Sequence, residues 1–405
     1  MSEEEIIPVN IQKETETQQM IKEISLQEKP RIYFIDNLRI LLTILVILHH
    51  LAITYGGDGG WPISDPSMNP SSQIVLTVFT AYNQAFFMAF FFMISAYFLP
   101  RSYEKKGTLK FLLDRFIRIG IPLILYLLFL DPLGNWILSN YYYPNDLSYI
   151  TIFTDQITTF SYSFGVTWFL LALLIFNVCY IIIVEVSKLM KLNISFTKFK
   201  DSFPSNFAII IGIFVVTILT FLVRLATPVG EQIFTFQFAH FIQYIFFFIF
   251  GIMAYRGGWF SNLNKKQGRT WGIVMVVTLP IAPLVLWLEG AMEHGVGNFL
   301  GGFTWQSAVY VLWESVICFS TIIFLSYLFK SRFNKKNKFS QIVSRTAYTA
   351  YIIQAVIIYT FTLLFLNISL HPLLKFLIVS PIVVIATFLV AFIIRQIPFA
   401  KRSLG

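Results

Sequence analysis

The sequence alternates between long apolar stretches and short polar connections. Ten of the stretches are long enough to cross the hydrocarbon core of a bilayer, which takes about 20 apolar residues in a helix. They cover residues 33–55, 74–99, 116–138, 164–188, 206–227, 232–255, 270–289, 304–329, 343–366 and 372–396. Because lipid offers no partner to an exposed backbone group, each stretch is predicted to be an α-helix. The pattern predicts an all-α, polytopic integral membrane protein with about ten transmembrane helices.

The composition agrees with this prediction. The chain of 405 residues is 56% hydrophobic and only 13% charged, whereas about a quarter of the residues in soluble domains are charged. The net charge of +9 does not indicate binding to nucleic acid, because the basic residues lie in short loops on one side of the predicted bundle.

The two sets of loops differ in their content of basic residues. Of the 30 Lys and Arg, all but Arg224 and Lys375 fall on one side of the predicted bundle. Since Lys and Arg are enriched in cytoplasmic loops, that side is predicted to be cytoplasmic and to hold both termini. The number of spans must then be even, which agrees with ten.

Three segments follow from these patterns. Residues 1–30 are polar and acidic, have no apolar signal segment, and are predicted to form a disordered cytosolic tail. Residues 31–397 are predicted to form one transmembrane domain, and residues 398–405 a short cytosolic tail. The location expected for such a multi-pass chain is the cell membrane.

The first apolar stretch carries ionisable side chains, which normally face a bundle interior or a wet cavity because lipid makes them costly. Arg39 and His50 are eleven residues apart, so at about 100° per residue they share one helix face, with roughly 16 Å between them along the axis. A neutral imidazole there can accept a proton from a hydroxyl, which predicts His50 as a general base. The alternative is an interfacial histidine bonded to a carbonyl. Arg39 and Asp36, which could pair, are predicted as catalytic residues together with His50, and His49 is predicted to pack beside the site or support it.

Two arginines, Arg115 and Arg118, open the third stretch three residues apart. Adjacent guanidinium groups bind phosphates through paired donors, so these residues are predicted to hold a polyanionic substrate at the cytoplasmic surface. Ordinary anchoring of a basic helix end is the alternative. Pro122 predicts a kink within this span.

Polar side chains also interrupt later stretches. Trp168 lies near the outer end of the fourth, and Gln354 is the amide of the ninth. His240 lies between Gln237 and Gln243 at intervals of three, a stripe that suits either contacts between helices or the lining of a cavity. Each of these positions is a candidate for the surroundings of His50.

Glu314 is a carboxylate within the apolar eighth stretch. It must pair or face water, and Arg224 and His240 are possible partners. The sequence contains no nucleophile elbow and no HExxH, CxxC or Walker motif, so neither a metal site nor a bound cofactor is predicted. The loops 56–73, 139–163 and 290–303 are rich in Gly, Pro, Tyr and Asn. They suit either interfacial anchoring or an outer vestibule that stacks on a sugar.

Several short motifs, taken in order, resemble the acyltransferase-3 family of membrane O-acyltransferases, near its glucan-modifying branch. They are D-x-x-R at Asp36 and Arg39, R-x10-H at Arg39 and His50, FFMISAYF at 91–98, R-x-x-R-x-x-x-P from Arg115 to Pro122, WFL at 168–170, QY and AYRGGW in the sixth stretch, and AYTAYIIQ at 347–354. Two positions depart from the family pattern. Ala96 replaces the usual Gly, and Gln354 stands where many members have His, so the resemblance does not extend to a second, late histidine.

The resemblance implies transfer of an acyl group, of the acetyl or succinyl class, from cytosolic acyl-CoA to a hydroxyl of an extracytoplasmic saccharide or glycolipid. Arg115 and Arg118 would hold the phosphates of CoA, and the thioester would meet His50 inside the membrane. His50 would then act either as the base or as a transiently acylated relay.

Two further functions fit the same residues. A transporter or flippase for a glycan or lipid-linked sugar could use the charged stripe of the first span as its path. A non-catalytic sensor or assembly partner is the third possibility. The expected partners are the lipid bilayer, acyl-CoA and a saccharide or glycolipid acceptor, and nucleic acid is not among them.

Overall fold

The computed structural model describes residues 32–143, 147–191, 202–290 and 295–404. Ten helical segments in these ranges are long and apolar enough to cross a membrane. They are Tyr33–Thr54, Pro70–Lys106, Thr108–Tyr142, Gly165–Leu189, Asn206–Arg224, Phe238–Arg256, Lys265–Leu288, Trp305–Arg332, Lys338–Leu366 and Pro372–Ile394. Each overlaps one predicted stretch, which confirms the all-α fold and the number of spans. The predicted N-terminal tail lies outside the described residues.

Most spans are one helix, and some are built from several. The first five contain α2 (Tyr33–Thr54), α3 (Pro70–Tyr97), α4 (Leu99–Lys106), α5 (Thr108–Arg115), α6 (Ile121–Leu125), α7 (Asp131–Tyr142), α9 (Trp168–Leu189) and α10 (Asn206–Arg224). The other five contain α11 (Phe241–Arg256), α13 (Lys265–Thr278), α14 (Ile281–Leu288), α17 (Trp305–Arg332), α18 (Lys338–Leu366) and α19 (Pro372–Ile394). The short helices are α8 (Tyr149–Thr159), α12 (Trp259–Asn262), α16 (Gly297–Leu300) and α20 (Pro398–Ser403).

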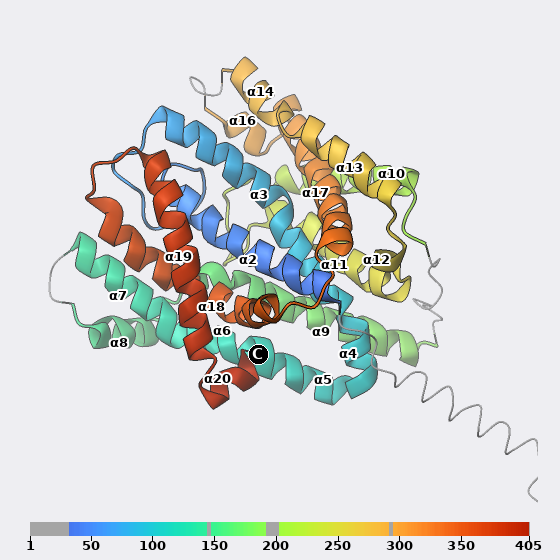
Figure 1. The fold of residues 1–405 in the computed structure, drawn as a ribbon, viewed down its shortest axis with the longest axis horizontal. Coiled ribbons are helices and arrows are strands. Elements are labelled where there is room, and N and C mark those ends of the chain that lie inside the picture. The colour runs from blue at the N-terminus through green and yellow to red at the C-terminus, as the bar shows by residue number, and fades with distance from the viewer. Residues whose placement is uncertain (1–31, 144–146, 192–201, 291–294, 405) are drawn as a thin grey trace, which may run out of the picture.

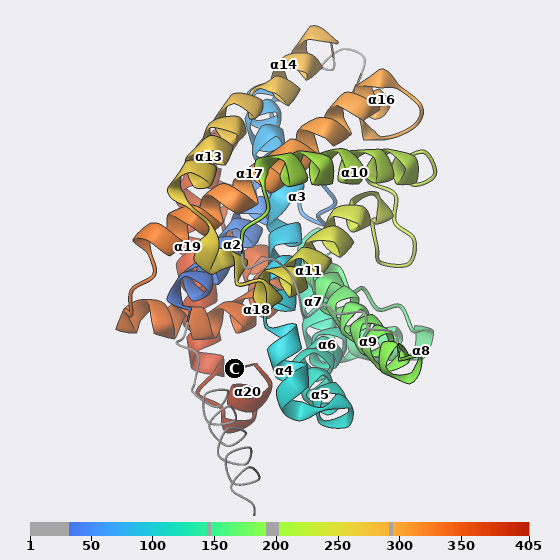
Figure 2. The ribbon, with the colours of Figure 1, turned by 90° about the vertical axis from the view of Figure 1, so that its right-hand side faces the viewer.

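Helices α2 and α3 form the centre of the bundle. α3 packs against α2, α11 and α17, while α2 also packs against α18 and α19. In Figure 2, α13, α14 and α17 lie on one side of this centre, and α4 to α9 lie on the other. Aromatic side chains fill the space between the central helices, among them Phe86, Phe90, Phe92 and Phe247, each at most 1% exposed. A close-packed aromatic core of this kind fixes the helices that carry the polar residues described below.

The peripheral helices expose apolar side chains. Large apolar residues that are more than a third exposed run along α10, α13 and α19, among them Phe207, Phe214, Ile218, Ile273, Val276, Leu377, Ile385 and Leu389. An apolar surface of this extent is unfavourable in water and matches the hydrocarbon of a bilayer. The protein is therefore a multi-pass membrane protein.

The third span departs from a regular α-helix at the predicted kink. Wide π-helical turns at Phe116–Gly120 and Tyr126–Leu130 flank α6, which contains Pro122. Proline has no amide hydrogen to donate to the carbonyl four residues earlier. That carbonyl belongs to Arg118, and the hydroxyl of Tyr348 donates to it over 2.7 Å. A neighbouring helix thus replaces the bond that Pro122 cannot make.

The sixth span begins later than predicted. The segment before it turns back on itself through a bridge between Ile233 and Phe236. Gln237 has an extended backbone, and His240 lies in a single 3-10 turn that precedes α11. The prediction of one helical stripe through Gln237, His240 and Gln243 is therefore wrong, because only Gln243 belongs to the α-helix.

Contacts between helix ends bring the basic loops together at one end of the bundle, which we call the basic end. Arg256, at the end of α11, lies 3.8 Å from Glu104 of α4. Lys330, near the end of α17, donates to the carbonyl of Ser261 over 2.6 Å. The C-terminal helix α20 packs against the Phe116–Gly120 turn at the same end. We call the opposite end, with the loop between α2 and α3, the loop end.

The two basic residues that depart from the charge distribution, Arg224 and Lys375, are buried in ion pairs. Arg224 Nη2 lies 2.5 Å from Glu314 Oε2, and Lys375 Nζ lies 2.7 Å from Asp65 Oδ2. The exposed fraction is 2% or less for all four side chains. A buried, paired cation does not contact lipid headgroups. Neither residue therefore weakens the difference in Lys and Arg content between the two sets of loops.

Candidate functional site

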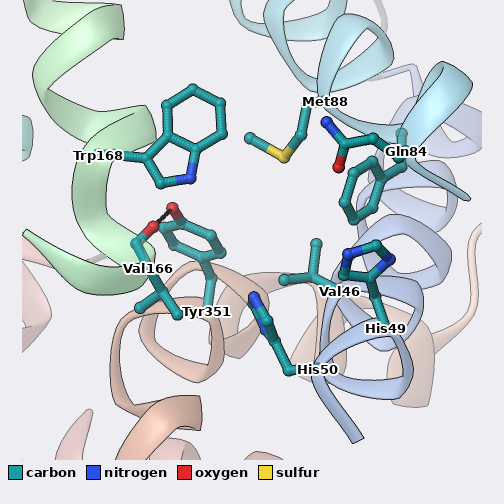
Figure 3. A pocket seen from close by; sticks show the side chains of 9 residues that line it. Val46, His49, His50, Gln84, Met88, Val166, Trp168 and Tyr351 are labelled. Carbon is teal, nitrogen blue, oxygen red and sulfur yellow. Dashed lines mark hydrogen bonds between the residues drawn. The ribbon is translucent and has the colours of Figure 1, made fainter. Parts of the chain in front are cut away.

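A cavity lies inside the bundle, between the helices of the centre and those of the fourth and ninth spans. Its volume is about 70 Å³, enough for a few water molecules. The residues that line it are Val46, His49, His50, Gln84, Phe87, Met88, Val166, Trp168 and Tyr351. Figure 3 shows His50 and Trp168 reaching this space from different sides, with Tyr351 between them. The polar groups of four separate spans therefore meet at one point.

His50 stands one turn before the end of α2. The hydroxyl of Thr54 donates to the His50 carbonyl over 3.2 Å, the bond from residue i to i−4 that threonine often makes within a helix. The imidazole is half-buried, and its Nδ1 is buried without a hydrogen bond. The ring therefore lines the cavity while its buried Nδ1 lacks the partner that buried polar atoms usually have.

Gln354 of α18 is the polar neighbour of this imidazole. It is fully buried and close enough to interact electrostatically with His50. Neither atom of its amide meets the geometry of a hydrogen bond within the described structure. Gln354 therefore lies beside His50 on α18, but it is not among the residues that line the cavity.

His49 contributes more directly to the cavity than predicted. Its ring lies 5.0 Å from the Phe87 ring and 5.7 Å from the ring of His50. The residue is 8% exposed and lines the cavity together with His50. It packs beside the site as predicted and also forms part of the cavity wall.

Arg39 lies on the same continuous helix as His50, toward the basic end. Its Nη1 is 3.8 Å from Asp36 Oδ1, which confirms the predicted pair, and its guanidinium lies 5.1 Å from the centre of the Phe98 ring. Arg39 is not among the residues that line the cavity. The structure therefore places Arg39 below the cavity rather than inside it.

Arg115 and Arg118 lie where α5 passes into the first π-helical turn, at the basic end. Arg115 donates to Ser102 Oγ over 2.9 Å, and Arg118 Nε lies 3.1 Å from Asp114 Oδ1. Lys106 Nζ is also 2.7 Å from Asp114. The region holds three cations around one carboxylate. Its net positive charge would favour the binding of an anionic acyl donor.

Behind the cavity, Glu314 joins two basic side chains in a buried cluster. Arg224 Nη2 is 2.5 Å from Glu314 Oε2, and His240 Nδ1 is 3.1 Å from Glu314 Oε1, close enough to donate a hydrogen bond. Arg224 Nε also donates to the carbonyl of Ala239 over 3.2 Å. The sequence offered Arg224 or His240 as possible partners of Glu314, and in the structure both pair with it.

Tyr244 connects this cluster to the cavity. Its ring stacks near His240 at 6.3 Å and on Trp168 at 5.8 Å. Gln84 Nε2 donates to the Tyr244 hydroxyl over 3.1 Å. Because Trp168 and Gln84 both line the cavity, the cluster supports the cavity wall through one aromatic ring.

Residues 32–396 match a protein-family model, Acyl_transf_3, described as an acyltransferase domain. The chain belongs to the acyltransferase-3 family. The match includes all ten spans, and it confirms the family inferred from the motifs, though not the glucan-modifying branch. An acyltransferase-3 protein is an enzyme that transfers acyl groups other than amino-acyl groups. No curated protein and no solved structure matches the chain.

Three neighbours of His50 in this acyltransferase-3 protein were not singled out from the sequence. Gln84 is an amide within an apolar span, so the rule that selected Gln354 also applies to it. Tyr351 lies within the AYTAYIIQ motif, and its hydroxyl donates to the carbonyl of Val166 (Figure 3). Trp61 stacks on His50 at 4.2 Å between ring centres. No periodicity marks Trp61, because it belongs to a loop.

Proposed function

We propose that this acyltransferase moves a short acyl group, acetyl or succinyl, from cytosolic acyl-CoA to a hydroxyl of an extracytoplasmic saccharide or glycolipid. The single observation that carries the proposal is the imidazole of His50, which lines a cavity inside the membrane domain and whose Nδ1 has no hydrogen bond. The enzyme would lie in the cell membrane, with its basic end in the cytosol.

His50 would act as the general base. One ring nitrogen takes the proton of the acceptor hydroxyl, and the oxygen attacks the thioester carbonyl. The carbon–sulfur bond then breaks, and the leaving CoA thiolate takes the proton from the imidazolium. Gln84 lines the same cavity, and its amide, which donates one hydrogen bond to Tyr244, has a second N–H to donate to the oxyanion that forms in between. The alternative, in which His50 itself carries the acyl group, uses the same atoms in two steps.

The donor would bind at the basic end. The phosphates of CoA suit the guanidinium groups of Arg115 and Arg118. A pantetheine arm of roughly 15–20 Å compares with the rise of about 16 Å along α2 from Arg39 to His50. The thioester could therefore reach His50 while the nucleotide stays at the surface, and Arg39 would lie beside the arm.

The size of the cavity supports a short acyl group, and the aromatic residues of the loop end support a saccharide acceptor. A cavity of about 70 Å³ suits a short acyl group better than a long chain. Aromatic residues such as Trp61 and Trp136 are carried by the loop end, and aromatic rings supply the flat apolar surface on which sugar rings stack. The acceptor would thus approach from the side opposite to the donor.

The proposal can be tested with purified protein in lipid nanodiscs. The protein is incubated with acetyl-CoA or succinyl-CoA, and release of the free thiol is followed with and without saccharide acceptors. We expect thiol release that depends on the acceptor. Intact thioester with every acceptor, together with sugar flux in proteoliposomes, would support a transporter instead.

The donor site gives a separate prediction. Replacing Arg118 by alanine is expected to raise KM for acyl-CoA about tenfold with little change in kcat, because about 1.4 kcal/mol of donor binding is lost. Initial rates at varied acyl-CoA concentration measure this change. Arg332→Ala, which removes an exposed arginine of the same end, serves as the matched control. An unchanged KM in the Arg115→Ala, Arg118→Ala double variant would place the donor elsewhere.

A further inference from the structure

The loop between α2 and α3 folds back over the end of α2. We call residues 56–69 the Trp61 loop. Its first turn is tight, because the amide of Gly57 donates to the carbonyl of Ala52 over 2.7 Å, and a side chain at Gly57 would meet Thr80 and Ala52 at 3.0 Å or less. Farther along, the amide of Asp65 donates to the carbonyl of Thr54 over 2.8 Å. Both bonds fasten the loop to the turn of α2 that follows His50.

The loop carries Trp61 onto the imidazole of His50. The two rings are stacked, with 4.2 Å between centres and 20° between planes. Tyr359 of α18 supports the indole at 5.2 Å. The residues on either side of Trp61, Gly60 and Pro62, are exposed, whereas the indole itself is partly buried. One aromatic ring therefore separates one face of His50 from the surface of the loop end.

A buried ion pair holds the loop in this position. Asp65 is 0% and Lys375 2% exposed, and Lys375 Nζ lies 2.7 Å from Asp65 Oδ2. Lys375 also donates to the carbonyl of Leu366 over 3.0 Å, and the amide of Ser67 donates to Asp65 over 2.8 Å. Ile63, between Trp61 and Asp65, is fully buried. The charged pair is thus well satisfied, and it binds the Trp61 loop to α19, more than 300 residues later in the chain.

A general base needs a partner that fixes the orientation of its ring, and histidine bases commonly use a carboxylate for this. No carboxylate is found among the residues that line this cavity. The stacked indole of Trp61 and the amide of Gln354 are the groups in contact with the His50 ring that can restrain it.

We propose that Trp61 is the positioning residue of His50 and also closes its outer face, and that the Asp65–Lys375 pair is the latch that keeps Trp61 in place. The catalytic meaning of this inference rests on the proposed acyl transfer. The acceptor hydroxyl must then reach His50 past the edge of Trp61, which makes the indole a determinant of acceptor choice. A ring-shaped acceptor such as a saccharide can stack on the indole as it arrives.

The position of Trp61 can be tested without any acyl transfer. The full-length protein in nanodiscs is treated with diethyl pyrocarbonate, which modifies accessible imidazole nitrogens, and modification of His50 is followed by peptide mass spectrometry. We expect modification to be several-fold faster in Trp61→Leu and in Lys375→Met than in the unmodified chain, and to return toward the original rate in Trp61→Phe. Lys375→Met retains the indole, so faster labelling there reports release of the loop.

Matched controls are Trp305→Leu for the indole and Lys338→Met for the ammonium group, since both side chains are exposed at sites away from the loop. The buried His240 should stay unmodified in every variant, because its labelling would report general unfolding. Equal labelling of His50 in Trp61→Leu and the unmodified chain, with His240 protected, would overturn the inference. An increase of the same size in Trp305→Leu would overturn it as well.

Activity then tests the positioning role. In Trp61→Leu we expect kcat to fall about 10- to 100-fold, the loss typical of a misplaced catalytic group, while KM for acyl-CoA stays within a factor of two. Recovery of kcat in Trp61→Phe would support positioning by an aromatic ring. A fall in donor affinity with unchanged kcat would contradict it. If the unmodified chain shows no acyl transfer at all, the proposed function fails while the labelling result still decides where Trp61 lies.

Discussion

Replacement of His50 by alanine is expected to reduce acyl transfer by about 10²- to 10⁴-fold, the usual contribution of a general base. His49 and His50 both line the cavity, and each has a buried Nδ1 without a hydrogen bond. His50 is assigned as the base because it is the less buried of the two and its ring stacks on Trp61 of the loop end. His49 shares the cavity wall, but its ring packs against Phe87. Thiol release from acetyl-CoA in the presence of an acceptor measures the effect in kcat.

The control for this variant is Lys338→Met, which alters an exposed titratable side chain away from the cavity and the Trp61 loop. It should retain the activity of the unmodified chain. His49→Ala should lose less than His50→Ala, because it removes part of the wall and not the proposed base. Full activity in His50→Ala would refute the assignment of the base, and loss of equal size in both cavity variants would show that the cavity is shared by two functional imidazoles.

The same variant series separates the two chemical routes. If His50 is acylated during turnover, a brief incubation with acyl-CoA and no acceptor should leave the acyl group on the His50 peptide. If His50 is a base only, that peptide stays unmodified while the thioester remains intact.

Replacement of Glu314 by leucine is expected to destabilise the protein by about 3–5 kcal/mol, because it leaves the buried guanidinium of Arg224 without its carboxylate. Arg224 is 0% exposed and Glu314 1%, so water cannot replace the lost partner. Activity should fall as well, because Glu314 contacts His240, whose ring stacks near Tyr244, and Tyr244 in turn packs on Trp168 of the cavity wall. Thermal unfolding in detergent, followed by tryptophan fluorescence, measures the stability.

The double variant Arg224→Leu, Glu314→Leu, together with the two single variants, forms a double-mutant cycle that measures the coupling between the two side chains. Removing both charges avoids an unpaired buried ion, so the double variant should lose much less stability than the sum of the single variants. Glu289→Leu, which alters an exposed carboxylate bonded to Gln306, is the control and should unfold near the original temperature. Strict additivity in the cycle would mean that the ion pair does not couple the two helices.

The sequence predicted much of the fold because the membrane imposes simple rules on it. Ten apolar stretches became ten helical segments, since lipid satisfies no backbone group and leaves the helix as the available form. The ends were less certain where polar residues extend a helix past the apolar stretch, as in Pro70–Lys106 and Thr108–Tyr142. The start of the sixth span was wrong for the opposite reason. Its aromatic residues before Phe238 are apolar enough for a span, yet they form a turn.

The candidate site was predicted in part. The rule that a polar group in an apolar span must pair or face water selected His50, Gln354, His240 and Glu314. His50 lines the cavity, Gln354 lies beside His50, and His240 and Glu314 belong to the buried cluster with Arg224. Helical periodicity placed Arg39 and His50 on one helix, but it did not show whether one cavity contains both. The distance along an axis is a local property, whereas a cavity depends on which neighbours fill the space between.

By itself, therefore, the sequence determined the number of spans, the unequal charge of the two ends and the family, because each of these depends on local composition or on short motifs in order. Only the tertiary structure decided that Trp61 covers His50, that Lys375 holds Asp65, and that Glu314 joins Arg224 to His240. These contacts join residues from different helices and loops. Their formation depends on how the whole bundle packs, and no spacing along the chain encodes that packing.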